Sequence, residues 1–139
     1  MEVRMGSRVE KALENHKKGY NCSQSVACAF CDKVPMSDKD LFRVMEGFGL
    51  GGGDMQGTCG AVAGAAAVLG LINSTEDIEN PNTKQSTYKM ARELNAKFRE
   101  MNGSTICKDL KGAETGKVLR TCDGCIADAA KLVAEVLGE

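Results

Sequence analysis

The amino-acid sequence predicts an all-α fold, with residues 1–139 forming a single-domain bundle of about five to six helices. Apolar residues recur at three- and four-residue steps, the spacing that places them on one face of a helix. No stretch of more than a few residues alternates with period two, as a half-buried strand would. Aromatic residues make up only 4% of the chain, and no repeat or flexible linker divides it.

The first helix is predicted at residues 8–18. Its apolar face comprises Val9, Ala12, Leu13 and His16. Gly19 follows directly and is typical of the position that ends a helix. A second helix is predicted at residues 21–31, because Asn21 can cap it and Gln24 completes a capping box. The next proline then prevents its continuation.

A third helix is predicted at residues 37–48, with Ser37 as its capping residue. We expect its buried side to consist of Leu41, Phe42, Val44, Met45 and Phe48. A glycine-rich loop follows and extends to Gly57, so the backbone there can adopt positive φ and approach a neighbour closely. The loop contains neither GxGxxG after a strand nor GxxxxGK[ST], which disfavours a nucleotide site.

A fourth helix is predicted at residues 59–72, the longest apolar stretch of the chain. Its length, about 14 residues, falls short of the roughly 20 that a membrane-spanning helix needs, so we interpret it as a buried core helix. Gly60 and Gly64 lie four residues apart among several alanines, and small residues let another helix approach closely. That approach is expected to bring other helix ends near Cys59. The alanine face can pack within one chain or form a homodimer.

Two further long helices are predicted toward the C-terminus, at residues 88–101 and 122–137. The apolar face of the first comprises Tyr88, Ala91, Leu94, Phe98 and Met101, before Gly103. The buried face of the second comprises Ile126, Ala129, Ala130, Leu132, Val133 and Val136.

The charge balance and the N-terminal sequence restrict partners and compartment. The chain has 18 Lys and Arg against 19 Asp and Glu, so no net field attracts nucleic acid or an anionic membrane. Residues 1–19 lack the apolar core of a signal peptide, and we therefore expect a cytoplasmic protein. Structural disulfides rarely persist there, so an odd count of seven cysteines favours metal binding or redox chemistry.

Several cysteines lie at predicted helix starts. Three of them directly follow a predicted capping residue: Cys22 follows Asn21, Cys59 follows Thr58, and Cys122 follows Thr121. Cys107 follows Ser104 and Thr105, either of which can cap a short helical turn. Free N–H groups and the helix dipole stabilise an anion at this position, so we expect these thiols to have lowered pKa values and to react or bind metal as thiolates.

The sequence also contains two CxxC pairs. Cys28 and Cys31 fall inside an apolar helical run, and we interpret them as core residues. Cys122 and Cys125 flank Asp-Gly at a helix start, an arrangement that is typical of a redox dithiol or of half a metal site. About 90 residues separate the pairs, far more than the 15 to 20 of a zinc ribbon, which disfavours that fold.

The stretches CGAVAG at residues 59–64 and NCSQSV at residues 21–26, with cysteines downstream, resemble the C_GCAxxG_C_C family of bacterial and archaeal redox-active proteins. The resemblance spans nearly the whole chain. Carried over by position, the family's cysteines fall on Cys22, Cys59, Cys107 and either Cys122 or Cys125. The resemblance implies a redox function and supplies no substrate.

The leading hypothesis is that Cys22, Cys59, Cys107 and Cys122 converge as a catalytic or cofactor-binding set. They would act either as thiol-disulfide partners or as ligands of an iron-sulfur cluster for electron transfer to an unidentified redox partner protein. A second hypothesis is a dithiol oxidoreductase that uses Cys59 with Cys22, or Cys122 with Cys125. The third is a non-catalytic module held by a four-cysteine zinc site, in which Cys125 is also a candidate ligand. Zinc is the less favoured cofactor, and whether the protein is an enzyme stays open.

Overall fold

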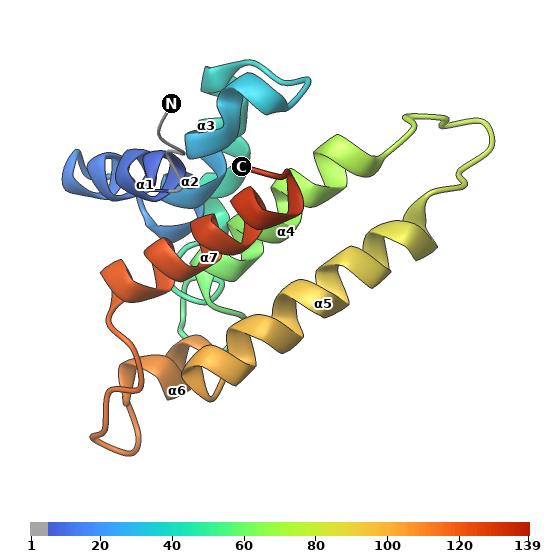
Figure 1. The fold of residues 1–139 in the computed structure, drawn as a ribbon. Helices are drawn as coiled ribbons and strands as arrows, with labels where there is room; N and C mark the ends of the chain where they lie inside the picture. The colour runs from blue at the N-terminus through green and yellow to red at the C-terminus, as the bar shows by residue number, and fades with distance from the viewer. Residues whose placement is uncertain (1–5) are drawn as a thin grey trace.

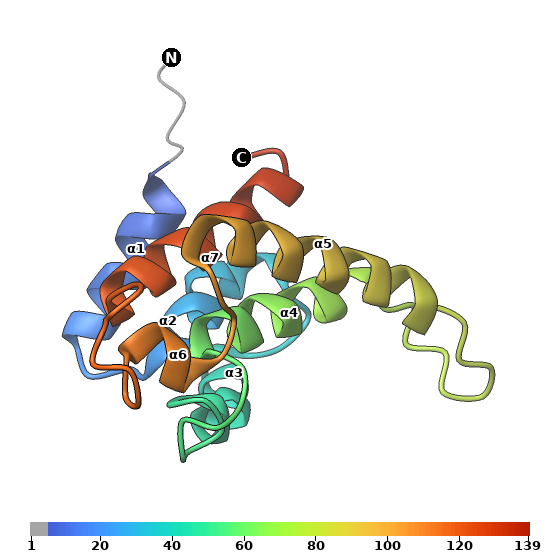
Figure 2. The same cartoon turned by 90° about the horizontal axis from the view of Figure 1, so that it is seen from below.

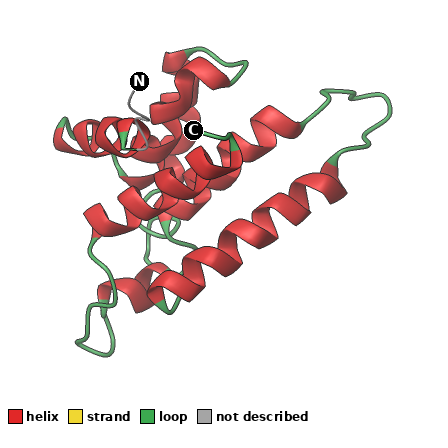
Figure 3. Ribbon diagram, viewed as in Figure 1, coloured by secondary structure: helices red, strands yellow, loops and turns green. Residues whose placement is uncertain are grey.

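The structure, a computed structural model, describes residues 6–139, and these residues form helices joined by turns and loops (Figure 3). The elements are α1 (Ser7–Lys17), α2 (Cys22–Ala27), the 3₁₀ segment η1 (Cys28–Lys33), α3 (Asp38–Met45), the 3₁₀ segment η2 (Glu46–Phe48), α4 (Gly60–Asn73), α5 (Lys84–Asn102), α6 (Cys107–Lys111) and α7 (Cys122–Val136). Within the described residues the only extended pairing is an isolated antiparallel bridge between Thr58 and Ile106. The predicted all-α fold is confirmed.

Helix α4 lies at the centre of the bundle, where α2, α5 and α7 all pack against it. Helices α4 and α5 run side by side, and the loop that joins them projects from one end of the molecule (Figures 1 and 2). Helix α1 packs on α2 and α7. The largest fully buried side chains include Phe30, Phe98, Leu41, Leu69, Leu110 and Ile126. The core therefore surrounds the apolar helix predicted from residues 59–72.

The small residues of α4 allow α2 to approach it closely. A Cβ atom added at Gly64 would lie 2.5 Å from the carbonyl oxygen of Ser23, and one added at Gly60 would lie 3.1 Å from the Cβ of Cys22. Real Cβ atoms do not come as close as the first of these distances, so Gly64 must remain glycine for the helices to pack as they do. The close approach predicted from the two glycines is confirmed.

Several predicted helix ends are also confirmed. Asn21 and Gln24 form the capping box of α2, and the Ser37 side chain accepts a hydrogen bond from the backbone N–H of Asp40. Gly103 ends α5 with φ +87°, and Gly19 follows α1 with φ +105°. Residues other than glycine rarely adopt such positive φ angles, which explains why glycine occurs at these ends.

Other details of the prediction are wrong. The second helix is α-helical only to Ala27 and continues as two 3₁₀ turns with a bend at Phe30 (φ −119°, ψ 23°). The predicted buried faces included five residues that are about half exposed: Val44, Phe48, Tyr88, Met101 and Val136. Helical spacing locates an apolar stripe, but it does not reveal how far neighbouring helices extend over that stripe. Residues near the ends of helices therefore reach solvent.

Among residues 6–139, no helix combines the length and the apolar character that crossing a lipid bilayer requires.

Candidate functional site

Five thiols face one small cavity at the end of the bundle where several helices begin. The lining cysteines are Cys22, Cys59, Cys107, Cys122 and Cys125. Leu50, Gly60, Leu110, Lys111 and Arg120 complete the wall. The cavity has a volume of about 20 Å³, enough for about one water molecule, so the thiols are close neighbours. The structure thus brings together every cysteine that the sequence analysis named as a candidate site residue.

Four of these cysteines lie at helix starts, as predicted, although two of the predicted caps are wrong. Asn21 caps α2 before Cys22, and Thr121 caps α7 before Cys122. Cys59 itself occupies the N-cap position of α4, and the N-cap of α6 is Ile106 with no side-chain cap. Thr58 and Ile106 instead form the isolated backbone bridge, which local sequence patterns do not reveal.

That bridge aligns two of the thiol-bearing segments. The backbone N–H of Cys59 donates to the carbonyl oxygen of Thr105 at 2.7 Å, and that of Cys107 donates to the carbonyl oxygen of Gly57 at 3.0 Å. Gly51, with φ +61°, lies so close that an added Cβ would be 2.5 Å from the Cβ of Cys107. The glycine-rich loop therefore packs its backbone directly against the site.

Cys59 is the thiol whose environment most favours the thiolate. The Cys125 thiol donates a hydrogen bond to it, and this interaction is the main reason that the Cys59 pKa is lowered to about 7. Burial opposes the effect, whereas the backbone N–H groups of Val62 and Ala61 and the charge of Lys111 assist it. The same hydrogen bond, together with burial, raises the pKa of Cys125 well above its ordinary value. One thiol of this pair is thus the natural nucleophile and the other its proton-bearing neighbour.

Cys22 and Cys122 form a second pair of neighbours in the cavity, and both side chains are partly exposed. The Cys22 thiol hydrogen bonds to Cys122, and Nζ of Lys111 donates to Sγ of Cys122 at 3.2 Å. Burial and the adjacent thiols Cys122 and Cys59 raise the Cys22 pKa to about 12. The bond to Cys122 raises the Lys111 pKa, which keeps a positive charge beside the thiols.

The predicted lowering of pKa at every helix start is wrong for two residues. The pKa of Cys22 and that of Cys107 are raised, and burial is the largest cause in both. Burial destabilises these two thiolates more than the helix dipole and the free N–H groups stabilise them. The dipole argument from sequence considers only local backbone, so it misses this opposing effect.

The five thiols of the cavity are candidate ligands for a metal ion or a cluster. Thiolates are the ligands that iron-sulfur clusters and structural zinc prefer. Within residues 6–139, however, no three or more His, Cys, Asp or Glu side chains are placed so as to hold one metal ion. All seven thiols are free. The chemistry of the residues therefore suits such a group, whereas their side chains are not arranged around a single metal ion.

The sequence profile of one protein family matches residues 20–136, a span that contains all seven cysteines. The family is described as "Putative redox-active protein (C_GCAxxG_C_C)". The chain belongs to this family. No curated protein and no solved structure matches it.

The geometry gives physical reasons for the CGAxxG motif at residues 59–64. Its cysteine is the N-cap of α4, its first glycine admits Cys22, and its last glycine admits the backbone of Ser23. The motif glycines therefore allow the close contact of α2 with α4 that brings Cys22 near Cys59. The family that carries this motif is named for redox activity. The fourth family cysteine remains open between two residues, because Cys122 and Cys125 both line the cavity.

The sequence analysis did not identify the two cationic residues of the five-thiol site. Lys111 contacts Cys122, and Arg120 lines the cavity while pairing with Asp128. One signal for Lys111 was present, because it lies four residues after Cys107 and residues at that spacing share a helix face. No local signal indicated Arg120, which reaches the cavity from the loop before α7.

Proposed function

We propose that the protein is a thiol-disulfide redox protein in which Cys59 and Cys125 form the inner reactive pair. The observation that carries this proposal is the direct contact between these two thiols, with Cys59 at the start of α4. A nucleophilic thiol beside a second thiol is the arrangement that disulfide exchange requires. Only 5% of Cys59 and 3% of Cys125 is exposed, so a substrate reaches them indirectly.

Cys22 and Cys122 would form the outer pair that meets the substrate, because both are partly exposed. The substrate class is a disulfide in a partner protein or in a small molecule. Cys122 as thiolate attacks one sulfur of that disulfide, and the displaced thiolate takes up a proton. Cys22 then attacks Cys122, which releases the second substrate thiol and leaves a Cys22–Cys122 disulfide. Lys111 supports the first step, because its ammonium already donates to Sγ of Cys122.

Exchange would then carry the disulfide inward. Cys59 attacks Sγ of Cys122 and frees Cys22, and Cys125 attacks Cys59 and frees Cys122. The two inner thiols lose two electrons and two protons in total, and the substrate disulfide gains them as two thiols. The two members of each pair are in contact, and both pairs line the same cavity, which supports this order of steps.

An iron-sulfur cluster is the alternative, and one observation favours it: five thiols face the same cavity, more than one dithiol needs. The same experiment tests both functions. The protein is purified without oxygen, its near-ultraviolet and visible absorbance is recorded, and iron, zinc and labile sulfide are measured. The reduced protein is then treated with oxidised glutathione, its free thiols are blocked, and tryptic peptides are analysed by mass spectrometry. Fragmentation of the linked peptides assigns the thiol in residues 121–131, and a C122S variant tests the transfer from the outer pair.

We expect a colourless protein without stoichiometric metal, in which oxidation links residues 44–84, which contain Cys59, to residues 121–131. Fragmentation should place this link at Cys125. It should form more slowly in C122S, because the outer pair can no longer pass the disulfide inward, and in C125S any link between these peptides should move to Cys122. Visible bands with iron and sulfide that are lost in C59S would overturn the proposal in favour of a cluster protein. Zinc alone, with no disulfide formed, would overturn it in favour of a structural module.

A further inference from the structure

The two cysteines outside the five-thiol site line a cavity of their own. Cys28 begins the first 3₁₀ turn of η1 and Cys31 begins the second. The cavity they face has a volume of about 650 Å³, within the range of small-molecule sites, and shares no lining residue with the five-thiol cavity. Cys28 is 9% exposed and packs in the core, as predicted, whereas Cys31 is partly exposed.

The Cys28 and Cys31 thiols are hydrogen-bonding neighbours, and the carboxylate of Asp38 accepts from Cys31. Two thiols in contact need little movement to form a disulfide. Burial, the Cys28 thiol and the Asp38 carboxylate raise the Cys31 pKa to about 12. The reactive thiolate is therefore scarce at neutral pH, and exchange at this pair is slow there and faster as pH rises.

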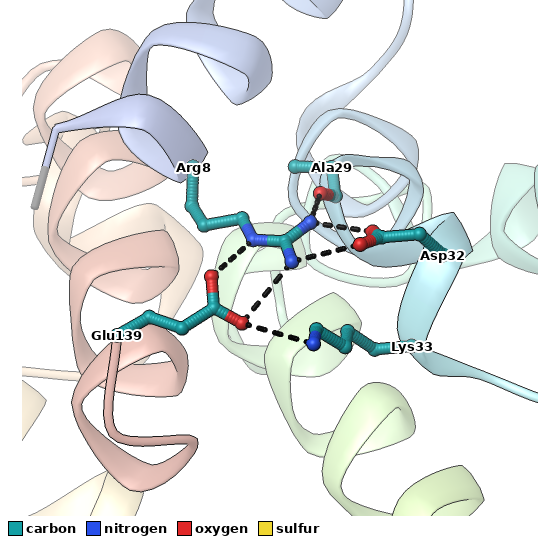
Figure 4. Close-up of polar contacts among 5 residues, drawn as sticks. All are labelled: Arg8, Ala29, Asp32, Lys33 and Glu139. Atoms are coloured by element: carbon teal, nitrogen blue, oxygen red, sulfur yellow. Dashed lines mark hydrogen bonds and ion pairs between the residues drawn. The ribbon is translucent and has the colours of Figure 1, made fainter. Parts of the chain in front are cut away.

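A guanidinium clamp fixes the bend that brings the two cysteines together (Figure 4). Nη1 of Arg8 donates to the carbonyl oxygen of Ala29 at 2.8 Å, and Nη2 donates to Oδ2 of Asp32 at 3.0 Å. Ala29 belongs to the first 3₁₀ turn and Asp32 to the second, and the guanidinium lies 5.0 Å above the ring of Phe30 at the bend. Arg8 thus holds both turns at once.

The charged side chains that line the cavity balance one another. Arg8, Lys11 and Lys18 stand against Asp32, Asp38 and Glu139. Arg8 engages Asp32 and also Glu139, whose Oε1 lies 2.7 Å from its Nε. The charge nearest the thiols is the Asp38 carboxylate, so the net charge of the lining does not select an anionic substrate.

We propose that Cys28 and Cys31 are a second, independent dithiol that exchanges with low-molecular-weight disulfides bound in the cavity that they line. This goes beyond the proposed function, because it uses other thiols and another cavity. Cys31 attacks one sulfur of the substrate, and the Cys31 proton passes to the displaced substrate thiolate. Cys28 then attacks Cys31 and releases the second substrate thiol with the Cys28 proton. The pair loses two electrons, and the substrate disulfide is reduced to two thiols.

The test follows the tryptic peptide of residues 19–33, which contains Cys22, Cys28 and Cys31. A C22S variant leaves only the proposed pair in this peptide. The reduced full-length protein is incubated with oxidised glutathione, sampled over time, blocked with N-ethylmaleimide and digested. We expect the peptide to become two hydrogen masses lighter and to lose both alkylation sites. In the wild-type protein, fragmentation of the same peptide places the disulfide, so the result does not depend on the folding of C22S.

Arg8→Gln tests the clamp, and Lys33→Gln is its matched control. Lys33→Gln removes a tryptic site, so in this variant the pair is followed in the peptide of residues 19–39. Lys33 lies in the same ion-pair group, 3.7 Å from Glu139, but does not hold the bend. Arg8→Gln should slow Cys28–Cys31 oxidation on the order of tenfold. In the same samples it should leave oxidation of the Cys59–Cys125 pair unchanged. Lys33→Gln should change neither rate. Two alkylated cysteines or a lasting glutathione adduct on Cys31 would overturn the proposal. Equal slowing of both pairs by Arg8→Gln would overturn the clamp's role.

Discussion

The Cys125 thiol donates its proton toward Sγ of Cys59, so a side chain one turn inside α7 controls the charge of a side chain at the start of α4. The two residues are 66 positions apart in the sequence. Their contact depends on the packing of α7 against α4. The first prediction concerns this hydrogen bond.

Replacing Cys125 by alanine should weaken the stabilisation of the Cys59 thiolate, because the hydrogen-bond donor is lost. We expect the group that titrates near pH 7 in thiolate absorbance to shift to higher pH in C125A, and to vanish in C59S. C28S, outside the five-thiol cavity, is the control and should leave the titration unchanged. An unaltered titration in C125A would show that Cys125 does not set this pKa.

Replacing Lys111 by methionine removes the cation that lowers the pKa of Cys59 and contacts Cys122. We expect disulfide exchange at pH 7 to slow by about threefold, because a partly buried charge is only partly screened. Lys111→Arg retains the charge and should keep most of the rate. Stopped-flow thiol trapping measures both variants. Equal rates in Lys111→Met and wild type would leave the cation without a role in reactivity.

The thiols also predict how stability depends on pH. The Cys59 pKa is about 7 in the folded protein against an ordinary 9.0, so between pH 7 and 9 the unfolded chain holds a proton that the folded chain has lost. Stability therefore rises with pH across this window, by about 3 kcal/mol, and this contribution is lost as pH falls from 9 through 7. Cys22 and Cys31 have raised pKa values of about 12, so they reduce stability above pH 9.

Urea unfolding of the reduced protein at several pH values measures this profile. In C59S the rise between pH 7 and 9 should disappear, while the decline above pH 9 remains. A rise that survives in C59S would assign it to another group.

The contact of α2 with α4 predicts contrasting effects at two glycines of one helix. Gly64→Val would force α2 away from α4, because even a Cβ lies 2.5 Å from the Ser23 carbonyl oxygen, and we expect a loss of about 3 kcal/mol. An added Cβ at Gly70 has its nearest neighbour at 3.8 Å, so Gly70→Ala should gain about 0.5–1 kcal/mol from helix propensity. Denaturant unfolding compares the two, and similar effects of both would contradict the packing.

Local patterns predicted what local interactions determine. The caps at Asn21 and Thr121 follow from the residues beside them, and both were identified from the sequence. The caps proposed at Thr58 and Thr105 failed because backbone groups of these segments pair with each other across a long stretch of chain. The convergence of the cysteines was expected from small residues on α4, whereas which thiol is easily ionised depends on burial and on neighbours from other helices. That information exists only in the packed molecule.

The paired backbone bonds between the Cys59 and Cys107 segments have a mechanical consequence. They anchor the starts of α4 and α6 to each other, so neither can shift alone. A disulfide draws two sulfurs to about 2.05 Å, closer than any hydrogen bond allows, and some backbone has to follow. The start of α7 is the side free to yield, because residues 113–121 before it are exposed and contain no helix. Oxidation at the core would then be reported at the surface by a change in the conformation of this one loop.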